Sequence, residues 1–386
     1  MTLPTPFLPS TLLAPLHALE QSYLKQVGPA RPGQPPHLDP YPADAPLHPD
    51  WAALDQPEAA SFWARLGTLL RLAATPLRVE PHATYNPHRA YPSPRALYAA
   101  HVVLQTAQGR WLLDPHRAQL RRLTHAAFTP PQAATLHLLG HLPTVPDSYG
   151  ALRPTLVALE AGHLLGALRH LGGGLGLRLT EQPGAASPDL GPGWWPLLSL
   201  TVEEGVADAG QAARAWADLQ ARSSGPGPFG LLTDQQPAGA APFQAALRKP
   251  DTVLLAHNLT GLAAGVYSST GLLPVPAPAL ADALQHAYSY PEDLNVSALN
   301  AAVLFTATYH PDQPFLHTQL ALGERAQRLC LALARAGLFA RPVRAYREAP
   351  LDALLNLPAN QTVAYALLCG RAPLNDLSLP LLRRTA

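Results

Sequence analysis

The sequence predicts an α+β protein made of two diverged copies of one domain, placed in tandem. Three observations carry this prediction. The chain has 386 residues, which is more than one domain usually contains. Its 47% content of hydrophobic residues is enough for two packed cores. The order of its helices and strands also repeats at a constant offset.

The repeat is clearest in two long helices, which include residues 159–176 and 320–337. Their glycines share an offset of 161 residues: Gly162 and Gly176 in the first helix, Gly323 and Gly337 in the second. Two strands precede each helix, and an apolar strand follows it, at 195–202 and at 363–368. The shared spacing and order favour duplication over a chance likeness of two Leu/Ala-rich helices.

Three regions follow from the distribution of prolines, glycines and periodic segments. An apolar helix near residues 10–26 and a proline-rich run at 29–49 form an N-terminal arm, 1–50, expected to lie extended over a neighbouring surface. The first domain covers 51–205, with a helix at 62–72 and a hairpin of strands 101–106 and 110–113. The second covers 206–386. Each domain is expected to hold an antiparallel-rich mixed sheet flanked by helices, and the two to form a pseudo-dimer within the chain.

Charge and hydropathy exclude several functional classes. A net charge of +1 gives no reason to expect a nucleic acid or a membrane surface as a partner. No apolar run reaches the roughly 18–20 residues that span a bilayer. Residues 1–20 lack a basic start and are broken by prolines, so we expect no signal peptide and a cytoplasmic location.

Metal, disulfide and nucleotide motifs are also missing from the sequence. Cys330 and Cys369 have no CxxC spacing and are expected to be buried thiols. His137 and His141 have a metal-compatible spacing but no glutamate of the zincin type between them, so no metal site is expected. The glycines near residue 173 do not form G-x-G-x-x-G, and neither a P-loop nor G-x-S-x-G occurs.

The first motif that carries chemistry follows the second long helix. Glycine at 337 suits a helix C-terminus and Pro342 prevents continuation, so residues 338–346 are expected to form a loop with free backbone N–H groups. The pattern G-L-x-A-x-P-x-x-x-aromatic resembles the helix-to-loop segment of FMN-dependent nitroreductases. The resemblance implies a flavin against residues Pro342, Val343, Arg344 and Ala345. In that family a backbone N–H here faces flavin N5, where a donor tunes the redox electronics. Arg344 reverses the charge of the acid usual in the family.

A second motif, Arg222-Ser223-Ser224, resembles the R-R-S-x-R-x-F phosphate signature of the same family. A guanidinium and clustered hydroxyls suit a phosphate monoester. Ala221 replaces the first arginine of that signature, and glycine and proline stand where the second belongs. The family also places basic residues after its last strand, which makes Arg371 a further candidate for the phosphate, with Arg383 and Arg384 as alternatives.

The third motif spans residues 91–98 and resembles the P-S-x-x-A-L-Y-P segment of SagB-type dehydrogenases. These nitroreductase-fold enzymes oxidise azolines to azoles in ribosomally made peptides. The resemblance implies that Pro92, Ser93 and Pro94 reach across the domain interface to the flavin. The competing interpretation is that the two prolines only mark the start of a strand.

Each copy supplies different parts of the predicted site. The first has the cross-interface segment, but its post-helix loop at 178–182 lacks the early proline; the second has the phosphate and N5 motifs. The sequence therefore predicts one complete site and one decayed site. Candidate catalytic residues are Tyr85 and Arg89 before the cross-interface segment and Tyr346 beside the N5 motif. The Lys-Tyr pair of the azoline-oxidising relatives is absent from this sequence.

The resemblance implies an FMN-dependent oxidoreductase that moves a hydride between flavin N5 and an organic substrate, with a peptide as the leading candidate. Two alternatives remain open. One is a degenerate flavin-fold scaffold or binding subunit in a complex with peptide-modifying partner proteins. The other is a general NAD(P)H nitro or quinone reductase acting on small molecules.

Overall fold

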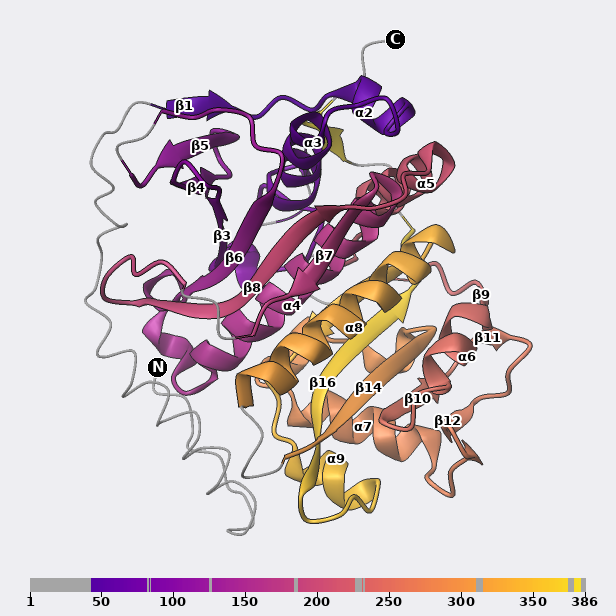
Figure 1. The fold of residues 1–386 in the computed structure, drawn as a ribbon. Coiled ribbons are helices and arrows are strands. Elements are labelled where there is room, and N and C mark those ends of the chain that lie inside the picture. Colours follow the sequence, from indigo (N-terminus) through magenta and orange to yellow (C-terminus); the bar gives the residue numbers. More distant parts are fainter. Residues whose placement is uncertain are drawn as a thin grey trace.

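The protein consists of two antiparallel sheets with a pair of long helices between them (Figure 1). The computed structural model describes residues 43–382, with gaps at 82, 84, 125–126, 184–186, 226–230, 232, 310–314 and 374–377. The predicted helix at 10–26 lies outside the described residues, as do Arg383 and Arg384. No helix of the described part is long and apolar enough to cross a membrane.

The first sheet contains seven strands in the order β1-β5-β4-β3-β6-β8-β7. They are β1 (Ala43–Pro46), β3 (Ala100–Gln105), β4 (Arg110–Asp114), β5 (Gln119–Arg122), β6 (Ala134–His141), β7 (Leu177–Glu181) and β8 (Trp194–Glu204). All neighbours are antiparallel. The predicted hairpin is confirmed, because the Thr106 N–H donates to the Gly109 carbonyl at 2.9 Å between β3 and β4. The end of the proline-rich run forms β1 at the sheet edge, where proline is tolerated.

The second sheet contains six strands in the order β13-β12-β10-β14-β16-β15. They are β10 (Thr252–Ala256), β12 (Gly265–Ser268), β13 (Gly271–Leu272), β14 (Ala301–Thr308), β15 (Phe339–Val343) and β16 (Gln361–Gly370). Taken in chain order, they occupy the same positions as β3 to β8 of the first sheet, and in each set of six a long helix follows the fourth strand. The predicted fold class, two tandem α+β domains, is confirmed, with both large sheets antiparallel rather than mixed.

Helices flank both sheets. They are α2 (Trp51–Asp55), α3 (Phe62–Ala74), α4 (Leu152–Gly174), α5 (Ala209–Ala221), α6 (Ala241–Leu247), α7 (Ala277–Ala287), α8 (Phe315–Arg335) and α9 (Ala349–Leu354). Asp50, Ser61 and Asp208 cap the N-termini of α2, α3 and α5 with side-chain oxygens, which satisfies free N–H groups there. Two short pairs complete the fold: β9 (Ala238–Gly239) with β11 (Leu259–Thr260), and β2 (Arg78–Val79) with β17 (Leu379–Pro380).

The long helices α4 and α8 lie side by side at the centre of the molecule (Figure 1). They approach most closely at Gly162 and Gly323. A Cβ at Gly162 would lie 2.2 Å from the Leu320 carbonyl oxygen, and one at Gly323 would lie 2.1 Å from that of Leu159. The contact is reciprocal, as expected when two copies of a domain are related by a pseudo-two-fold axis. Of the two glycine pairs that share the offset, Gly162 and Gly323 therefore reflect the helix crossing, whereas Gly176 and Gly337 have positive φ angles of 65° and 72° just after the helices.

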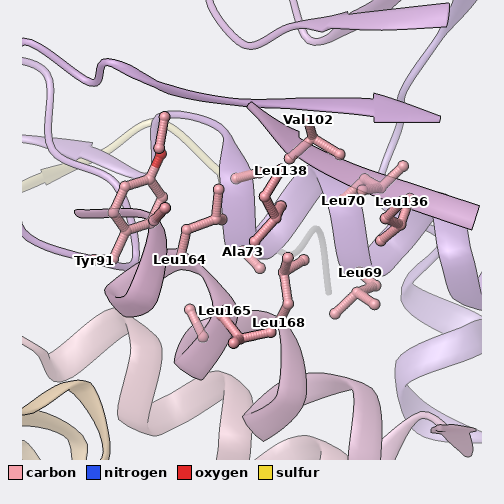
Figure 2. Close-up of a cluster of buried hydrophobic side chains, with 14 of the residues drawn as sticks. Leu69, Leu70, Ala73, Tyr91, Val102, Leu136, Leu138, Leu164, Leu165 and Leu168 are labelled. Atoms are coloured by element: carbon pink, nitrogen blue, oxygen red, sulfur yellow. The ribbon is translucent and has the colours of Figure 1, made fainter. Parts of the chain in front are cut away.

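The first core lies between α3, α4 and the first sheet (Figure 2). Leucines of α3 pack against α4 and β6 in this core: Leu69 and Leu70 from α3, Leu164, Leu165 and Leu168 from α4, Leu136 and Leu138 from β6. Burying each such side chain contributes roughly 1.5–3 kcal/mol. Because α4 is covered by α3, α5, α8 and the sheet, most of its residues are buried and they are largely apolar on every side.

Residues 338–346 differ from the prediction of a loop. Phe339–Val343 forms the edge strand β15, paired with β16 in a register that places Val343 opposite Ala366. Pro342 is compatible with this strand because an edge position does not require its N–H. In the first half, the segment 178–182 that was expected to be a loop likewise belongs largely to β7.

Candidate functional site

A cavity of about 390 Å³ lies where the two halves meet. Its wall combines the segment before β3, one side of α4, the residues after α5, and the end of β15. The volume falls within the roughly 300–1,000 Å³ typical of small-molecule sites. The cavity brings together most of the predicted site residues: Tyr85, Pro92, Ser93, Pro94, Arg222, Ser224, Pro342, Val343, Arg344 and Ala345.

Two predicted residues lie directly behind the wall. The Ser223 carbonyl oxygen accepts a hydrogen bond from the Ala340 N–H at 3.0 Å. The Ser223 hydroxyl oxygen accepts one from the Gly225 N–H at 3.1 Å. Arg89 is buried, donates to the Tyr91 hydroxyl at 3.0 Å and places its guanidinium 4.0 Å from the centre of the Tyr98 ring. Both residues hold the shape of the wall.

Two other predicted residues lie elsewhere. The Tyr346 ring is buried in a hydrophobic cluster of the second half that includes Leu280, Leu351 and Val363, and its hydroxyl donates to the Val363 carbonyl at 3.3 Å. Arg371 follows the far end of β16, five residues beyond the Ala366–Val343 pair, or about 17 Å along an extended strand. It pairs there with Asp234 at 3.2 Å. The structure therefore does not bring Arg371 or Tyr346 to the cavity.

Arg222 is the cation most deeply set in the cavity wall. It is 1% exposed, and it donates from Nη1 to the Ser224 hydroxyl at 3.0 Å and from Nη2 to the Arg89 carbonyl at 3.3 Å. Its Nε–H has no hydrogen-bond partner among the described residues. Burial, together with the neighbouring charge of Arg78, lowers the pKa of Arg222 to about 10, so it remains a cation at neutral pH. A buried cation with a free donor is suited to an anionic group.

The chain turns sharply after β15. The Tyr346 N–H donates to the Arg344 carbonyl at 2.8 Å, and the Ala345 carbonyl accepts from the Ser289 N–H at 2.8 Å. The N–H of Ala345 makes no hydrogen bond to another described residue, which leaves a backbone donor in the cavity wall. The Arg344 guanidinium is buried and pairs with Glu348 at 2.6 Å, so its charge is balanced within the second half.

The segment before β3 has an unusual backbone. Arg95, Ala96 and Tyr98 have positive φ angles of 48°, 52° and 53°, a region that residues other than glycine rarely adopt. Two hydrogen bonds hold this shape: the Tyr98 N–H donates to the Ser93 hydroxyl at 2.8 Å, and the Arg89 N–H donates to the Tyr98 hydroxyl at 2.9 Å. Local strain of this kind is typical of functional sites.

Sequence reasoning missed two ionisable residues of α4 that line the cavity, Glu160 and His163. Both are buried. The His163 imidazole lies between the halves: its Nδ1–H donates to the Gln327 side-chain oxygen at 3.0 Å, and its Nε2 accepts from the Tyr365 hydroxyl at 2.9 Å. The Gln327 amide nitrogen donates to the Ala90 carbonyl at 3.0 Å, which fixes this arrangement. A carboxyl and an imidazole in the middle of a long, Leu/Ala-rich helix were the signal that could have revealed them.

Tyrosines form the outer part of the cavity. Tyr149, Tyr288 and Tyr290 line it together with Tyr85, which is 45% exposed. The Arg95 guanidinium lies 5.5 Å from the centre of the Tyr149 ring and 6.0 Å from that of Tyr85. Such an aromatic and cationic rim can hold a flat or extended ligand by stacking.

Other candidate sites in the described residues lack this combination of groups. A larger cavity of about 880 Å³ lies between α6, α8 and β14 and contains none of the predicted site residues. The two histidines with metal-compatible spacing make local hydrogen bonds: His137 with Ser199 and Gln105, and His141 with Thr144. No cluster of metal-binding side chains occurs among the described residues.

Solved structures provide the comparison for the fold. A protein assigned as a nitroreductase from Anabaena variabilis superposes with a TM-score of 0.65 at 13% identity, covering 92% of this chain and 99% of that one. One from Ralstonia eutropha gives a TM-score of 0.31 at 18% identity, over 54% and 90% of the two chains. The Escherichia coli microcin synthetase complex McbBCD, with a truncated pro-microcin bound, gives a TM-score of 0.29 at 17% identity. The match covers 37% of this chain and 68% of that one.

No family model matches the sequence, and no curated protein matches it. The conclusion therefore rests on three-dimensional structure. The similarity to the Anabaena protein extends over nearly the whole length of both chains, so it includes both halves and their arrangement. This chain has the nitroreductase fold, as two copies in one polypeptide.

Proposed function

We propose that the chain is an FMN-dependent oxidoreductase that moves a hydride between flavin N5 and an organic substrate. The observation that carries this proposal is the cavity between the halves. Its wall contains both the buried cation Arg222 and Ala345, whose backbone N–H makes no hydrogen bond to another described residue. The three segments whose sequences resemble flavin-binding motifs all contribute to it.

The residues present fit the chemical needs of FMN. A phosphate requires charged and hydroxyl donors, which Arg222 and Ser224 offer. An isoalloxazine ring requires flat apolar walls and a donor near N5, for which Pro342, Val343 and the Ala345 N–H are suited. When bound, FMN supplies hydride transfer, and the protein supplies binding, orientation and exclusion of water.

The remaining residues have supporting roles in this proposal. Pro92, Ser93 and Pro94 are the residues of the first half that contact the flavin, which is held mainly by residues of the second half. Tyr85, at the exposed rim, contacts the substrate, whereas Arg89 acts through Tyr98 as a positioning residue. Arg371 and Tyr346 have no role in the site. The open rim of tyrosines and Arg95 suits an extended substrate, and we favour a peptide.

Titration of the purified 386-residue chain with FMN tests the proposal. Binding quenches flavin fluorescence and raises the Tm, because a ligand at about 100 times its Kd stabilises the folded state by about 2.7 kcal/mol. A protein that is colourless and unchanged by FMN in both measurements contradicts it. Rapid bleaching of bound flavin by NAD(P)H would point to a general nitro or quinone reductase.

Two observations favour a second function, a scaffold or binding subunit among peptide-modifying partner proteins. The Arg344 charge is balanced by Glu348, and the Ser93 hydroxyl is hydrogen-bonded to Glu160, so two of the predicted groups are occupied within the chain. In this case the cavity would bind a peptide without flavin. Failure to bind FMN, with the fold intact, is its expected signature.

A further inference from the structure

The carboxyl group of Glu160 is the one acidic side chain of α4 in the cavity wall among the described residues. It is 2% exposed. Oε1 accepts from the Ala100 N–H at 2.7 Å, and Oε2 accepts from the Ser93 hydroxyl at 2.5 Å. Glu160 lies on the central helix and Ser93 on the strained segment before β3, so the hydrogen bond joins two elements of the wall.

The Ser93 hydroxyl can serve as a two-way relay. Its oxygen accepts from the Tyr98 N–H at 2.8 Å, which leaves one lone pair and one proton for other partners. While Glu160 is ionised, the hydroxyl proton is donated to the carboxylate. Once Glu160 is protonated, the carboxyl can donate to Ser93, and the Ser93 proton becomes available to a group in the cavity.

The surroundings of Glu160 permit it to change protonation state near neutral pH. Burial raises the pKa of Glu160 to about 7, against the opposing effects of the Ser93 and Ala100 hydrogen bonds and the Arg89 charge. Burial also keeps His163, one turn further along α4, neutral by lowering its pKa to about 3. The other titratable groups near the carboxyl come from several elements: Arg89, Tyr91, Tyr98, Arg222 and Tyr365.

We propose that Glu160 and Ser93 form a proton-transfer pair that serves the substrate in this cavity, an inference that rests on the proposed oxidoreductase function. In the reducing direction, the Ser93 O–H bond breaks as an O–H or N–H bond forms on the substrate. The Glu160 carboxyl proton then moves to the Ser93 oxygen, which leaves a carboxylate that water reprotonates. The substrate class is therefore a carbonyl, quinone, nitro or imine compound, whose heteroatom takes up a proton on reduction.

Four variants separate this role from a structural one. Glu160→Gln keeps an acceptor for Ala100 but cannot titrate, and Ser93→Ala removes the relay whereas Ser93→Thr keeps a hydroxyl. Glu203→Gln, at an exposed glutamate that pairs with Arg178, is the matched control. Infrared titration of the flavin-free protein should show a carboxyl that ionises near the Glu160 pKa, absent in Glu160→Gln and present in Glu203→Gln.

The second measurement is anaerobic reoxidation of the dithionite-reduced, FMN-loaded protein by p-benzoquinone. The wild-type rate should fall as pH rises through the Glu160 pKa. Glu160→Gln and Ser93→Ala should be slower by about 10²-fold at low pH and independent of pH, and Ser93→Thr should restore part of the rate.

The outcomes separate the two proposals. A wild-type protein that binds no FMN overturns the proposed function and this inference with it. If FMN binds, the inference alone is overturned by any of three results: no reaction of the wild type with quinone, a Glu160→Gln variant with the wild-type rate and pH profile, or a carboxyl signal that does not titrate.

Discussion

Gly162 and Gly323 face each other across the α4–α8 crossing, so that a Cβ on either one would lie 2.9 to 3.0 Å from the Cα of the other. Substitution by alanine at either position must push the helices apart. We expect a loss of about 1–3 kcal/mol in the free energy of unfolding, as for other overpacked sites, measured by urea denaturation. Gly67→Ala in α3 is the control, since its added Cβ would have no neighbour closer than 3.7 Å. An equal effect of the three substitutions would show that the crossing is not tightly packed.

Arg222 and Arg71 stand near the ends of α5 and α3, but only Arg222 lines the cavity. We expect Arg222→Ala to weaken FMN binding at least tenfold, because it removes the buried cation. Arg71→Ala should leave the affinity unchanged, because Arg71 donates to Thr75 and to the Pro76 carbonyl within its own segment. Fluorescence titration measures both affinities, and circular dichroism verifies folding. Arg222→Lys keeps the charge but lacks the planar set of donors, so its affinity for FMN should lie between that of the wild type and that of Arg222→Ala. Equal affinities for the two alanine variants would refute the assignment of Arg222.

The Glu160 carboxyl also makes folding stability depend on pH. Its pKa is raised by burial from 4.5 to about 7, so between these values the folded state binds a proton that the unfolded state has released. The contribution of Glu160 to the free energy of unfolding is fully present below pH 4.5. It is lost as the pH rises to about 7, and the loss is at most about 3 kcal/mol. Glu160→Gln should abolish this loss.

Buried histidines affect stability in the opposite direction. Burial lowers the pKa of both His101 and His163 from 6.5 to about 3, so they reduce stability as pH falls below 6.5. The wild type and the Glu160→Gln variant share these histidine contributions, so the contributions cancel when the free energies of unfolding of the two proteins are subtracted. Chemical denaturation over this pH range gives that difference, and a difference independent of pH would contradict the raised pKa.

Tyr365 and His163 couple the two halves through a buried hydrogen bond of 2.9 Å. Tyr365→Phe should cost about 1–3 kcal/mol, because it leaves the buried His163 Nε2 without a donor. Tyr267→Phe is a suitable control: its hydroxyl donates to the Ala263 carbonyl at a more exposed position, and we expect a change within about 0.5 kcal/mol. A double-mutant cycle with His163→Leu isolates the coupling, for which we expect about 0.5–3 kcal/mol. Additive effects would show that the hydrogen bond does not couple the halves.

Several elements could be predicted because their causes are local. The hairpin between β3 and β4 follows from a turn sequence, and α3 from an apolar periodicity that matches the observed helix. Residues 338–346 could not be assigned in this way. Glycine and proline there suggested a loop, but pairing with β16 makes the segment an edge strand, and only the finished sheet shows that Pro342 needs no donor.

The candidate site likewise contains some residues that the sequence indicated and others that it did not. The phosphate-like, N5-like and cross-interface motifs were visible in the sequence, and the cavity contains residues of all three. Glu160, His163 and Tyr365 were not identified, since each lies in an apolar segment whose pattern shows burial but not its partners. Arg371 and Tyr346 were proposed from their neighbours in the chain, yet strand direction and side-chain alternation carry them elsewhere.

The sequence by itself determined the class of fold and the duplication, because periodicity, turn chemistry and glycine spacing are encoded within short stretches of chain. The segments that could hold a flavin were indicated by their resemblance to family motifs. Only the tertiary structure decided which of these segments share a cavity, which charges are balanced inside the protein, and where a carboxyl lies beside a hydroxyl. Those properties depend on distances between residues far apart in the chain. The packing of α4 against α8 brings the segments of the two halves to one cavity.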